Sequence, residues 1–283
     1  MDTKLQLRTH RRWDGLTADA VALLTSARED PFAIPLLVSP STAHARAVGQ
    51  AVADEVGVAA GLQGKTASAL RRELSQSLLD MDPQVDPWSG SALTLRIFDL
   101  LRPDDPNMAA VSEHVQACRV RGIAHADWTT AQQFSAVLQS LIHHSPAVLE
   151  QWRAGEDVDA EGSALPWDKA WWPHVWRLLH DDGHPDPMTQ LTQLCSALGA
   201  APLRWPSCVW ISPAAPEWQD YSLAQALSRR IPVTVLHLLP ACAEHSRWEP
   251  FNSVREHTNL RWHECVQQCG GQAHDHCDHT DPE

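Results

Sequence analysis

Residues 34–42 read IPLLVSPST, and this stretch decides the fold class. The continuous apolar run from Ile34 to Val38 is typical of a strand that is buried on both faces of a parallel sheet, because a strand with one solvated face alternates instead. A polar turn at residues 39–42 follows, and apolar residues then recur at helical spacing up to Gly57, a residue type that often ends a helix. The stretch therefore predicts half of a βαβ unit.

Related patterns occur near both ends of the chain. Residues 5–8 alternate like a short strand and precede a helical pattern at residues 17–24. Residues 208–212 and 233–239 are short apolar runs, joined by a helical pattern that begins near Pro216. Strands that alternate with helices indicate an α/β fold with a parallel sheet. Its neighbouring parallel strands are expected at residues 34–38, 209–211 and 233–239.

The middle of the chain carries helical patterns and no strand pattern. Apolar stripes at helical spacing occur within residues 70–78, 93–101, 127–144 and 171–179. Because strand patterns lie on both sides of it, this block is predicted to be a large all-helical insertion. The expected domains are the first part of the α/β domain at 1–64, the helical insertion at 65–200, the return of the α/β domain at 201–247, and a disordered, His- and Cys-rich polar tail at 248–283.

Composition limits the functions open to the chain. Hydrophobic residues make up 43% and charged residues 20%, which is typical of a globular protein. The formal net charge of −13 argues against a protein that wraps nucleic acid with its own basic surface, so DNA contact should be local or assisted by a partner. No leader-like segment and no apolar stretch of the ~20 residues that span a bilayer occurs. We expect a cytoplasmic protein with no membrane partner and, given seven cysteines, no disulfides.

Five stretches, in order, resemble the N-terminal helicase-like domain of RecC, the gamma subunit of the bacterial RecBCD recombination complex (exodeoxyribonuclease V). Residues 37–46 are similar to the family's LVPSPGMARWL segment, and residues 57–60 to its GIAAN segment. The strands at 208–212 and 235–239 are similar to VFVFGIS and HLFLLNPCREYW. The other matching residues lie in the helical block: Ala92, Leu93, Arg96, Leu100, Leu101, Pro146, Leu149, Trp152, Gly155, Trp171, Trp176 and Arg177.

The resemblance covers residues from about 5 to 244 and corresponds to the first portion of a RecC polypeptide, without its second motor-like domain and nuclease-like C-terminal domain. It implies a helicase-like (RecA-like) core without its own ATPase, which binds and guides single-stranded DNA in double-strand break repair by homologous recombination. The implied partners are RecB-like and RecD-like subunits and a single-stranded or double-stranded DNA end. ATP and Mg are expected on those subunits, with no cofactor in this chain.

Two other functions stay open. One is a stand-alone degenerate helicase-fold interaction module, a truncated RecC without DNA-processing activity. The other is a small NTPase that uses Lys65, since Gly64, Lys65 and Thr66 fit the permissive form of the phosphate-loop pattern. A working phosphate loop lies between a buried strand and a helix, yet this segment follows a helix, and the turn at residues 39–42 lacks a Gly-Lys pair. We therefore interpret Thr66 as a helix cap and predict no catalytic residue.

Arg46 and Arg71 are the best candidates for DNA contacts, with the hydroxyls of Ser41 and Thr42 as phosphate contacts. The resemblance implies that this region lines the route along which single-stranded DNA is scanned. The chain also departs from the family here, because Arg46 lacks the Trp that follows it in the family, Arg71 replaces an aromatic residue, and residues 136–139 replace part of an acidic helix. These departures argue against the reading of Chi.

We interpret two groups of potential metal ligands as residues that do not bind a metal. Residues 180–186 read HDDGHPD, which fits a loop that ends in an Asp cap before Pro187 at the start of a helix. The tail ligands match no standard zinc-finger spacing: Cys265, Cys269, His274, His276, Cys277 and His279. Tryptophans on apolar helical faces are expected in the core. The main examples are Trp152, Trp171, Trp176 and Trp210.

Overall fold

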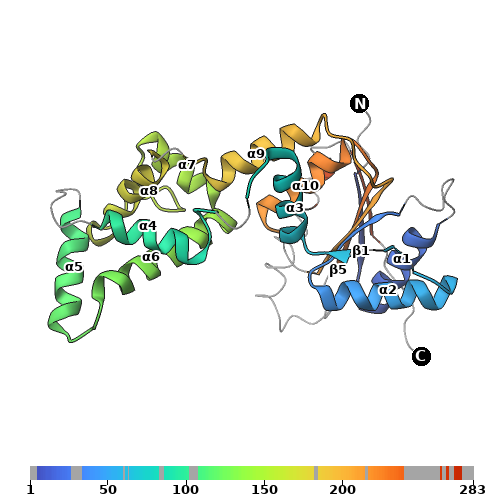
Figure 1. The fold of residues 1–283 in the computed structure, drawn as a ribbon, viewed down its shortest axis with the longest axis horizontal. Coiled ribbons are helices and arrows are strands. Elements are labelled where there is room, and N and C mark those ends of the chain that lie inside the picture. Colours follow the sequence, from blue (N-terminus) through green and yellow to red (C-terminus); the bar gives the residue numbers. More distant parts are fainter. Residues whose placement is uncertain are drawn as a thin grey trace. The chain divides into compact units, whose positions relative to one another are not determined.

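The chain divides into two compact units in its computed structural model, one formed by Met1–Met81 with Gln193–Glu283 and the other by Asp82–Thr192. The first, here called the α/β unit, contains the sheet, and the second, the helical unit, consists mainly of helices (Figure 1). No helix in the described part of the chain is long and apolar enough to cross a bilayer. The described residues are 5–26, 34–59, 61–62, 64–82, 86–101, 108–181, 184–213, 216–238, 262, 266–267 and 271–275.

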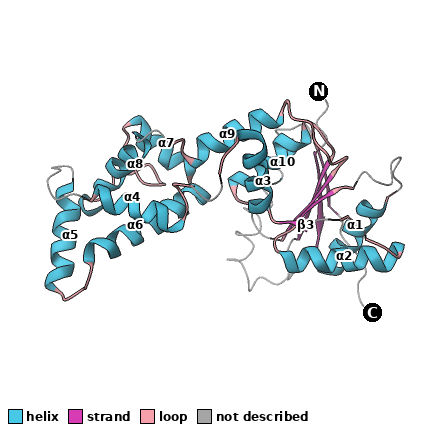
Figure 2. Ribbon diagram, viewed as in Figure 1, coloured by secondary structure: helices cyan, strands magenta, loops and turns pink. Residues whose placement is uncertain are grey.

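The α/β unit is built on a six-stranded sheet whose strand pairings are all parallel (Figure 2). The strands β2, β4 and β5 are neighbours, as predicted, with Leu37 opposite Val209 and Trp210 opposite Val235. The prediction of an α/β fold with a parallel sheet is therefore confirmed. In sheet order the strands are β3 (Gly64–Lys65), β2 (Leu36–Val38), β4 (Cys208–Ser212), β5 (Val233–Leu238), β1 (Leu5–His10) and β6 (Gln272–Asp275).

Helices α1 (Trp13–Thr25) and α2 (Thr42–Val56) pack on one face of the sheet. The α2 helix begins where Ser41 Oγ accepts a hydrogen bond from the backbone N–H of His44 (3.2 Å), and it ends at Gly57, whose φ is 82°. This side of the sheet forms one apolar core. Its buried residues are Leu16, Ala20, Leu24, Leu37, Ala45, Val48, Val52, Val209, Ile211 and Leu236.

Helices α3 (Ala67–Leu79) and α10 (Trp218–Ser228) lie on the opposite face of the sheet (Figure 1). Successive side chains of a strand point to opposite faces. Since Val209 and Ile211 belong to the core under α1 and α2, the side chain of Trp210 between them points toward α3 and α10. Trp210 is buried there, as predicted, and the apolar strands are covered on both faces.

The helical unit buries tryptophans from several of its helices. Trp152, Trp171 and Trp176 are in its core, as predicted. The indole N–H groups of Trp152 and Trp176 donate to the carbonyl oxygens of Val158 (2.7 Å) and Leu149 (2.9 Å), so these buried rings keep their polar atoms satisfied. The elements are α4 (Gly90–Leu100), α5 (Ala109–Val120), α6 (Ala126–His144), α7 (Pro146–Ala154), the 3-10 helix η3 (Trp167–Lys169), α8 (Trp171–Asp181) and α9 (Pro187–Leu198), which continues into the α/β unit.

The described part of the tail differs from the expected disorder. Strand β6 pairs with β1, and Trp262 and Val266 are buried. The indole N–H of Trp262 donates to Ser212 Oγ (3.2 Å) at the end of β4. The polar composition of residues 248–283 concealed this order, because a strand such as β6 is held by backbone hydrogen bonds to a distant strand rather than by its own apolar side chains.

The observed division into units also differs from the expected boundaries. Helix α3 falls in the α/β unit and not in the helical insertion expected at residues 65–200. The reason is that β3, directly before α3, pairs with β2, and that Arg71 of α3 pairs with Asp220 of α10. Helical pattern alone cannot distinguish a helix that covers a sheet from one that belongs to a helical domain.

Gly64 provides a test of the packing of α2 against β3. A Cβ atom added at Gly64 would collide with the Cβ atom of Ala45, whereas one added at Gly49, inside α2, would meet nothing within 4 Å. Gly64→Ala should lower the free energy of unfolding by about 1–3 kcal/mol through overpacking. Gly49→Ala is the matched control and should raise it by about 0.5–1 kcal/mol, because Gly weakens helix interiors. Urea unfolding followed by tryptophan fluorescence measures both. Equal stability of Gly64→Ala and wild type would contradict the packing.

Candidate functional site

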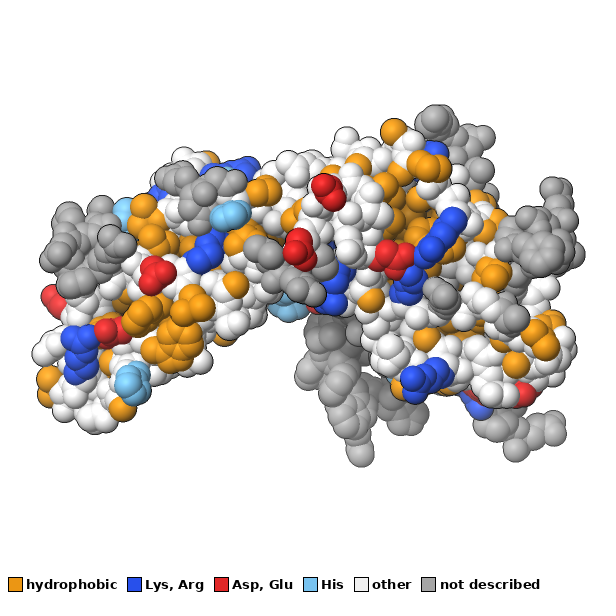
Figure 3. Space-filling model, viewed as in Figure 1, with side chains coloured by type: hydrophobic (Ala, Val, Ile, Leu, Met, Phe, Trp, Pro, Cys, Tyr) orange, Lys and Arg blue, Asp and Glu red, His pale blue; other side chains and the backbone are white. Residues whose placement is uncertain are grey.

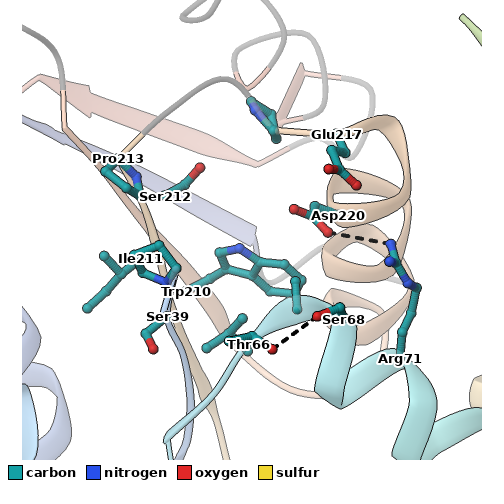
Figure 4. Close-up of a pocket in the computed structure, with 14 residues that line it drawn as sticks. Ser39, Thr66, Ser68, Arg71, Trp210, Ile211, Ser212, Pro213, Glu217 and Asp220 are labelled. Carbon is teal, nitrogen blue, oxygen red and sulfur yellow. Dashed lines mark hydrogen bonds and ion pairs between the residues drawn. The ribbon is translucent and has the colours of Figure 1, made fainter. Parts of the chain in front are cut away.

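A pocket of about 260 Å³ lies at the carboxyl ends of β2 and β4 (Figure 4). Its other walls come from the first turns of α3 and α10. In open α/β sheets, ligands bind outside the carboxyl ends of the strands. The pocket is therefore at the position in the α/β unit where a ligand site is expected. Its polar and aromatic lining includes Ser39, Thr66, Ser68, Arg71, Trp210, Ser212, Glu217 and Asp220.

The turn after β2 is held by its own hydrogen bonds. The backbone N–H of Ser39 donates to the carbonyl oxygen of Lys65 (2.8 Å), and Ser39 Oγ donates to the carbonyl oxygen of Ser41 (2.8 Å). Ser41 Oγ caps α2 and also lies 2.8 Å from Nδ1 of His44. A phosphate loop instead offers backbone amides and a lysine to its ligand. The hydroxyls of Ser39 and Ser41 thus serve to fix the start of α2.

Arg71 is the cation of the pocket. Its Nη1 atom lies 3.7 Å from Asp220 Oδ1, an ion pair that is too long for a hydrogen bond, and 20% of its side chain is exposed. Nη1 itself is buried and makes no hydrogen bond with the described residues. Burial lowers the pKa of Arg71, and the charges of Asp220 and Glu217 oppose that change, so the guanidinium stays protonated. The pocket therefore offers a ligand one buried donor with acceptors beside it.

Lys65, from the phosphate-loop-like pattern, is engaged outside the pocket. Its Nζ atom is paired with Glu73 of α3, whose other oxygen accepts from Arg204 Nη2 (2.6 Å). Thr66 caps α3 by accepting from the backbone N–H of Ala69 (3.2 Å), which confirms the interpretation of this residue as a cap. The segment follows α2 and Gly57, as expected, and its Gly64 and Lys65 themselves form the two-residue strand β3. Lys65 therefore lies in a strand and is paired with Glu73, so it does not stand in a phosphate-binding loop.

The four residues predicted to contact DNA do not form one cluster. Arg71 lines the pocket on the α3 face, whereas Ser41, Thr42 and Arg46 lie at the start of α2, on the other face of the sheet. Thr42 and Arg46 are exposed, and Arg46 has no ion-pair partner among the described residues. The two arginines therefore have different surroundings, one exposed to solvent and one balanced by carboxylates.

The loop before α9 has the structural role that its sequence predicted. Asp186 is fully buried, and its Oδ1 atom accepts from the backbone N–H groups of Met188 (2.9 Å) and Thr189 (3.1 Å) at the start of α9. Within the described ranges, no three His, Cys, Asp or Glu side chains are grouped as metal ligands. The tail residues Cys265, Cys269, His276, Cys277 and His279 lie outside the described residues.

A comparison with protein families covers both units. The family model described as RecC, N-terminal domain, matches residues 5–273. The chain belongs to the RecC family. The resemblance to RecC seen in the sequence is thereby confirmed, and it extends past β5 to β6 at the other edge of the sheet.

Two relatives within the RecC family show how much of such a protein this chain represents. It is 25% identical over 192 residues to the RecBCD enzyme subunit RecC of Mycolicibacterium smegmatis, and 26% identical over 199 residues to that of Mycobacterium tuberculosis. Each match covers 65% of this chain but only 16% and 17% of the relatives. The chain thus spans about a sixth of the length of the curated relatives that it matches.

Sequence reasoning missed the carboxylates of the pocket. Asp220 and Glu217 stand at the start of α10, where acidic residues are common because they interact favourably with the helix dipole. That ordinary explanation left no reason to connect them with Arg71, which precedes them by about 150 residues in the sequence. Arg71 is one of two adjacent arginines in α3, and only its position beside the buried Leu70 and Leu74 indicated that a counter-charge had to lie nearby.

The pairing of Lys65 leads to a prediction about nucleotides. The purified chain should hydrolyse no ATP above background, with or without DNA, and Lys65→Ala should leave this unchanged, because Lys65 binds Glu73. The same substitution should lower the free energy of unfolding by at most about 1 kcal/mol, because Glu73 keeps its ion pair with Arg204. Arg204→Ala removes the other cation from Glu73 and is the matched control. DNA-stimulated hydrolysis that is lost in Lys65→Ala and kept in Arg204→Ala would refute the prediction.

Proposed function

We propose that the chain is a RecC-type subunit without its own ATPase, which binds and guides single-stranded DNA within a RecBCD-type helicase-nuclease during double-strand break repair by homologous recombination. Membership of the RecC family, across residues 5–273, is the observation that carries this proposal. The relatives are named as RecC subunits of the RecBCD enzyme. We also propose that the α/β unit is a helicase-like (RecA-like) core and that the helical unit is an insertion in it.

The pocket supports a role in contacting a base. Its volume of about 260 Å³ is below the range of about 300–1,000 Å³ that is typical of pockets for drug-sized ligands. One unstacked base is a better match than a nucleoside triphosphate. Proteins recognise single strands by aromatic walls and by hydrogen bonds to base edges. Arg71 supplies a donor and Asp220 and Glu217 supply acceptors, which together complement a base edge that carries a carbonyl beside an amino group, while Trp210 lines the pocket as a buried residue.

The start of α2 supports a role in contacting phosphates. Thr42 and Arg46 are exposed there, and the exposed guanidinium of Arg46 has no carboxylate beside it in the described part of the chain. Phosphate contacts of this kind fix the position of a strand and do not read its sequence. With Ser41 engaged as a helix cap, Arg46 and the hydroxyl of Thr42 carry this contact.

The proposed partners are RecB-like and RecD-like subunits, which would bring ATP, Mg and nuclease activity, together with a DNA end. A net charge of −13 fits this arrangement, because an acidic chain that holds DNA at few points needs other subunits to close the channel. Co-purification of the tagged chain with these subunits is the test. A chain that binds neither subunit would instead support the stand-alone interaction module.

The two arginines should affect DNA binding differently. Arg46→Ala should weaken binding of a labelled single-stranded oligonucleotide and make the slope of log affinity against log salt shallower by roughly 0.7, the value for one lost phosphate contact. Arg71→Ala should weaken binding with little change of slope, since its charge is already balanced by Asp220. Arg121→Ala, an exposed arginine at the end of α5, is the control of equal charge and should bind as wild type does.

Fluorescence anisotropy over a salt series measures these effects, with a duplex of the same length as the comparison ligand. Wild-type binding should be weak and biased to the single strand. If the wild type binds clearly and both Arg46→Ala and Arg71→Ala bind equally well, these residues are not the site. If the chain alone binds nothing at low salt, DNA recognition by this chain outside its complex has to be abandoned.

A further inference from the structure

The proposed contact with phosphates involves few charges. On the face of the molecule drawn in Figure 3, the Lys and Arg side chains of the described residues lie in small separate groups and form no continuous basic tract. At the start of α2 the proposed contact consists of the guanidinium of Arg46 and the hydroxyl of Thr42, both exposed. Each group contributes fully only if the first turn of α2 is already ordered, because ordering a frayed turn on binding costs conformational entropy. The residues that hold this turn therefore affect the contact.

His44 contacts the residue that caps this turn in two ways. Its backbone N–H donates to Ser41 Oγ (3.2 Å), which is the usual hydrogen bond of a helix cap. Its Nδ1 atom also lies 2.8 Å from the same oxygen, a hydrogen bond between side chains whichever of the two atoms carries the proton. The imidazole thus fixes the side chain of Ser41 on α2 in addition to the cap itself.

Trp13 holds the imidazole of His44 from the neighbouring helix. Trp13 is the first residue of α1, and its ring centroid lies 4.7 Å from that of His44, with 58° between the ring planes. Tilted aromatic pairs at this separation attract each other. Trp13 also packs against the apolar core under α1 and α2, so its own position is fixed. The two rings therefore connect the core to the cap of α2.

The start of α3 shows that a helix of the α/β unit can begin without such a connection. Thr66 accepts from the backbone N–H of Ala69 (3.2 Å), which is the same kind of cap as that of Ser41, and its hydroxyl also meets that of Ser68 (3.1 Å). That cap consists of hydroxyls and a backbone N–H. The two rings at α2 are additional to what a helix start requires, and they stand beside the turn that is proposed to contact phosphates.

We propose that Trp13 and His44 are positioning residues for the phosphate contact at the start of α2. They hold Ser41, Ser41 caps the first turn, and the ordered turn presents Arg46 and the hydroxyl of Thr42 to a single strand. Both rings act through Ser41 and need no contact with DNA of their own. This inference rests on the proposed binding of single-stranded DNA and adds to it the residues that preorganise one of its contacts.

Substitutions of His44 test the role of the imidazole, with circular dichroism to check folding. His44→Ala should bind the labelled single-stranded oligonucleotide about fivefold more weakly, the factor that corresponds to a lost helix cap, whereas His44→Asn keeps a hydrogen-bonding group near the position of Nδ1 and should stay within about twofold of wild type. Anisotropy over the salt series should also give His44→Ala a shallower slope, as it should Arg46→Ala. His180→Ala removes a histidine that is stacked on Trp176 in the helical unit, and this matched control should bind as wild type does.

A double-mutant cycle with Arg46 separates positioning from a general loss of stability. If His44 acts through the turn that carries Arg46, then His44→Ala should weaken binding by less than about twofold in the Arg46→Ala background. Trp13→Leu, which removes the ring but keeps an apolar side chain against the core, should behave as His44→Ala does in both backgrounds.

The outcomes separate this inference from the proposed function. An equal effect of His44→Ala in both backgrounds would overturn the inference. So would binding at the wild-type level by His44→Ala or Trp13→Leu when Arg46→Ala binds more weakly, because the phosphate contact would then exist without help from the rings. If Arg46→Ala itself binds as wild type does, the phosphate contact at the start of α2 is wrong and this inference falls with it.

Discussion

The α/β unit depends on one constraint, the need to cover both faces of strands that are apolar throughout. Every residue of β2 and β4 is buried, and so are the first five of β5. A parallel sheet of this kind is stable only when helices pack on both of its faces. The α1 and α2 helices meet this need on one face, and α3 and α10 on the other. Because parallel strands all end at the same edge, their polar turns are brought together there.

Much of this arrangement could be predicted from the sequence. The apolar runs located β2, β4 and β5, and a local cap and a glycine located both ends of α2. The strands β3 and β6 could not be found in this way, because one has two residues and the other reads QAHD, and both are held by backbone pairing with distant partners. Of the candidate site, Arg71 was found and its carboxylates were not, since the pairing with α10 spans the whole helical unit.

Some Lys and Arg side chains of the α/β unit form ion pairs that stabilise the fold, whereas others remain available to a ligand. Lys65 and Arg204 share Glu73, and Arg8 donates to Asp19 (2.6 Å) beside His10. Burial opposes ionisation of Asp19, but the hydrogen bond with His10 and the charge of Arg8 outweigh it and lower the pKa of this carboxyl. These cations hold helices to strands. Their charges are already balanced by carboxylates of the fold.

Arg71 differs from these structural cations in its geometry. At 3.7 Å from Asp220, its Nη1 atom gains electrostatic attraction without a hydrogen bond to any described residue, and leaving such a donor buried and unsatisfied costs about 1–3 kcal/mol or more. A ligand atom that accepts this hydrogen bond recovers that energy without disrupting the ion pair. The fold thus leaves this arginine without a hydrogen-bond partner among the described residues at the carboxyl edge of the sheet, whereas Lys65, which resembles a catalytic residue in the sequence, is neutralised by Glu73.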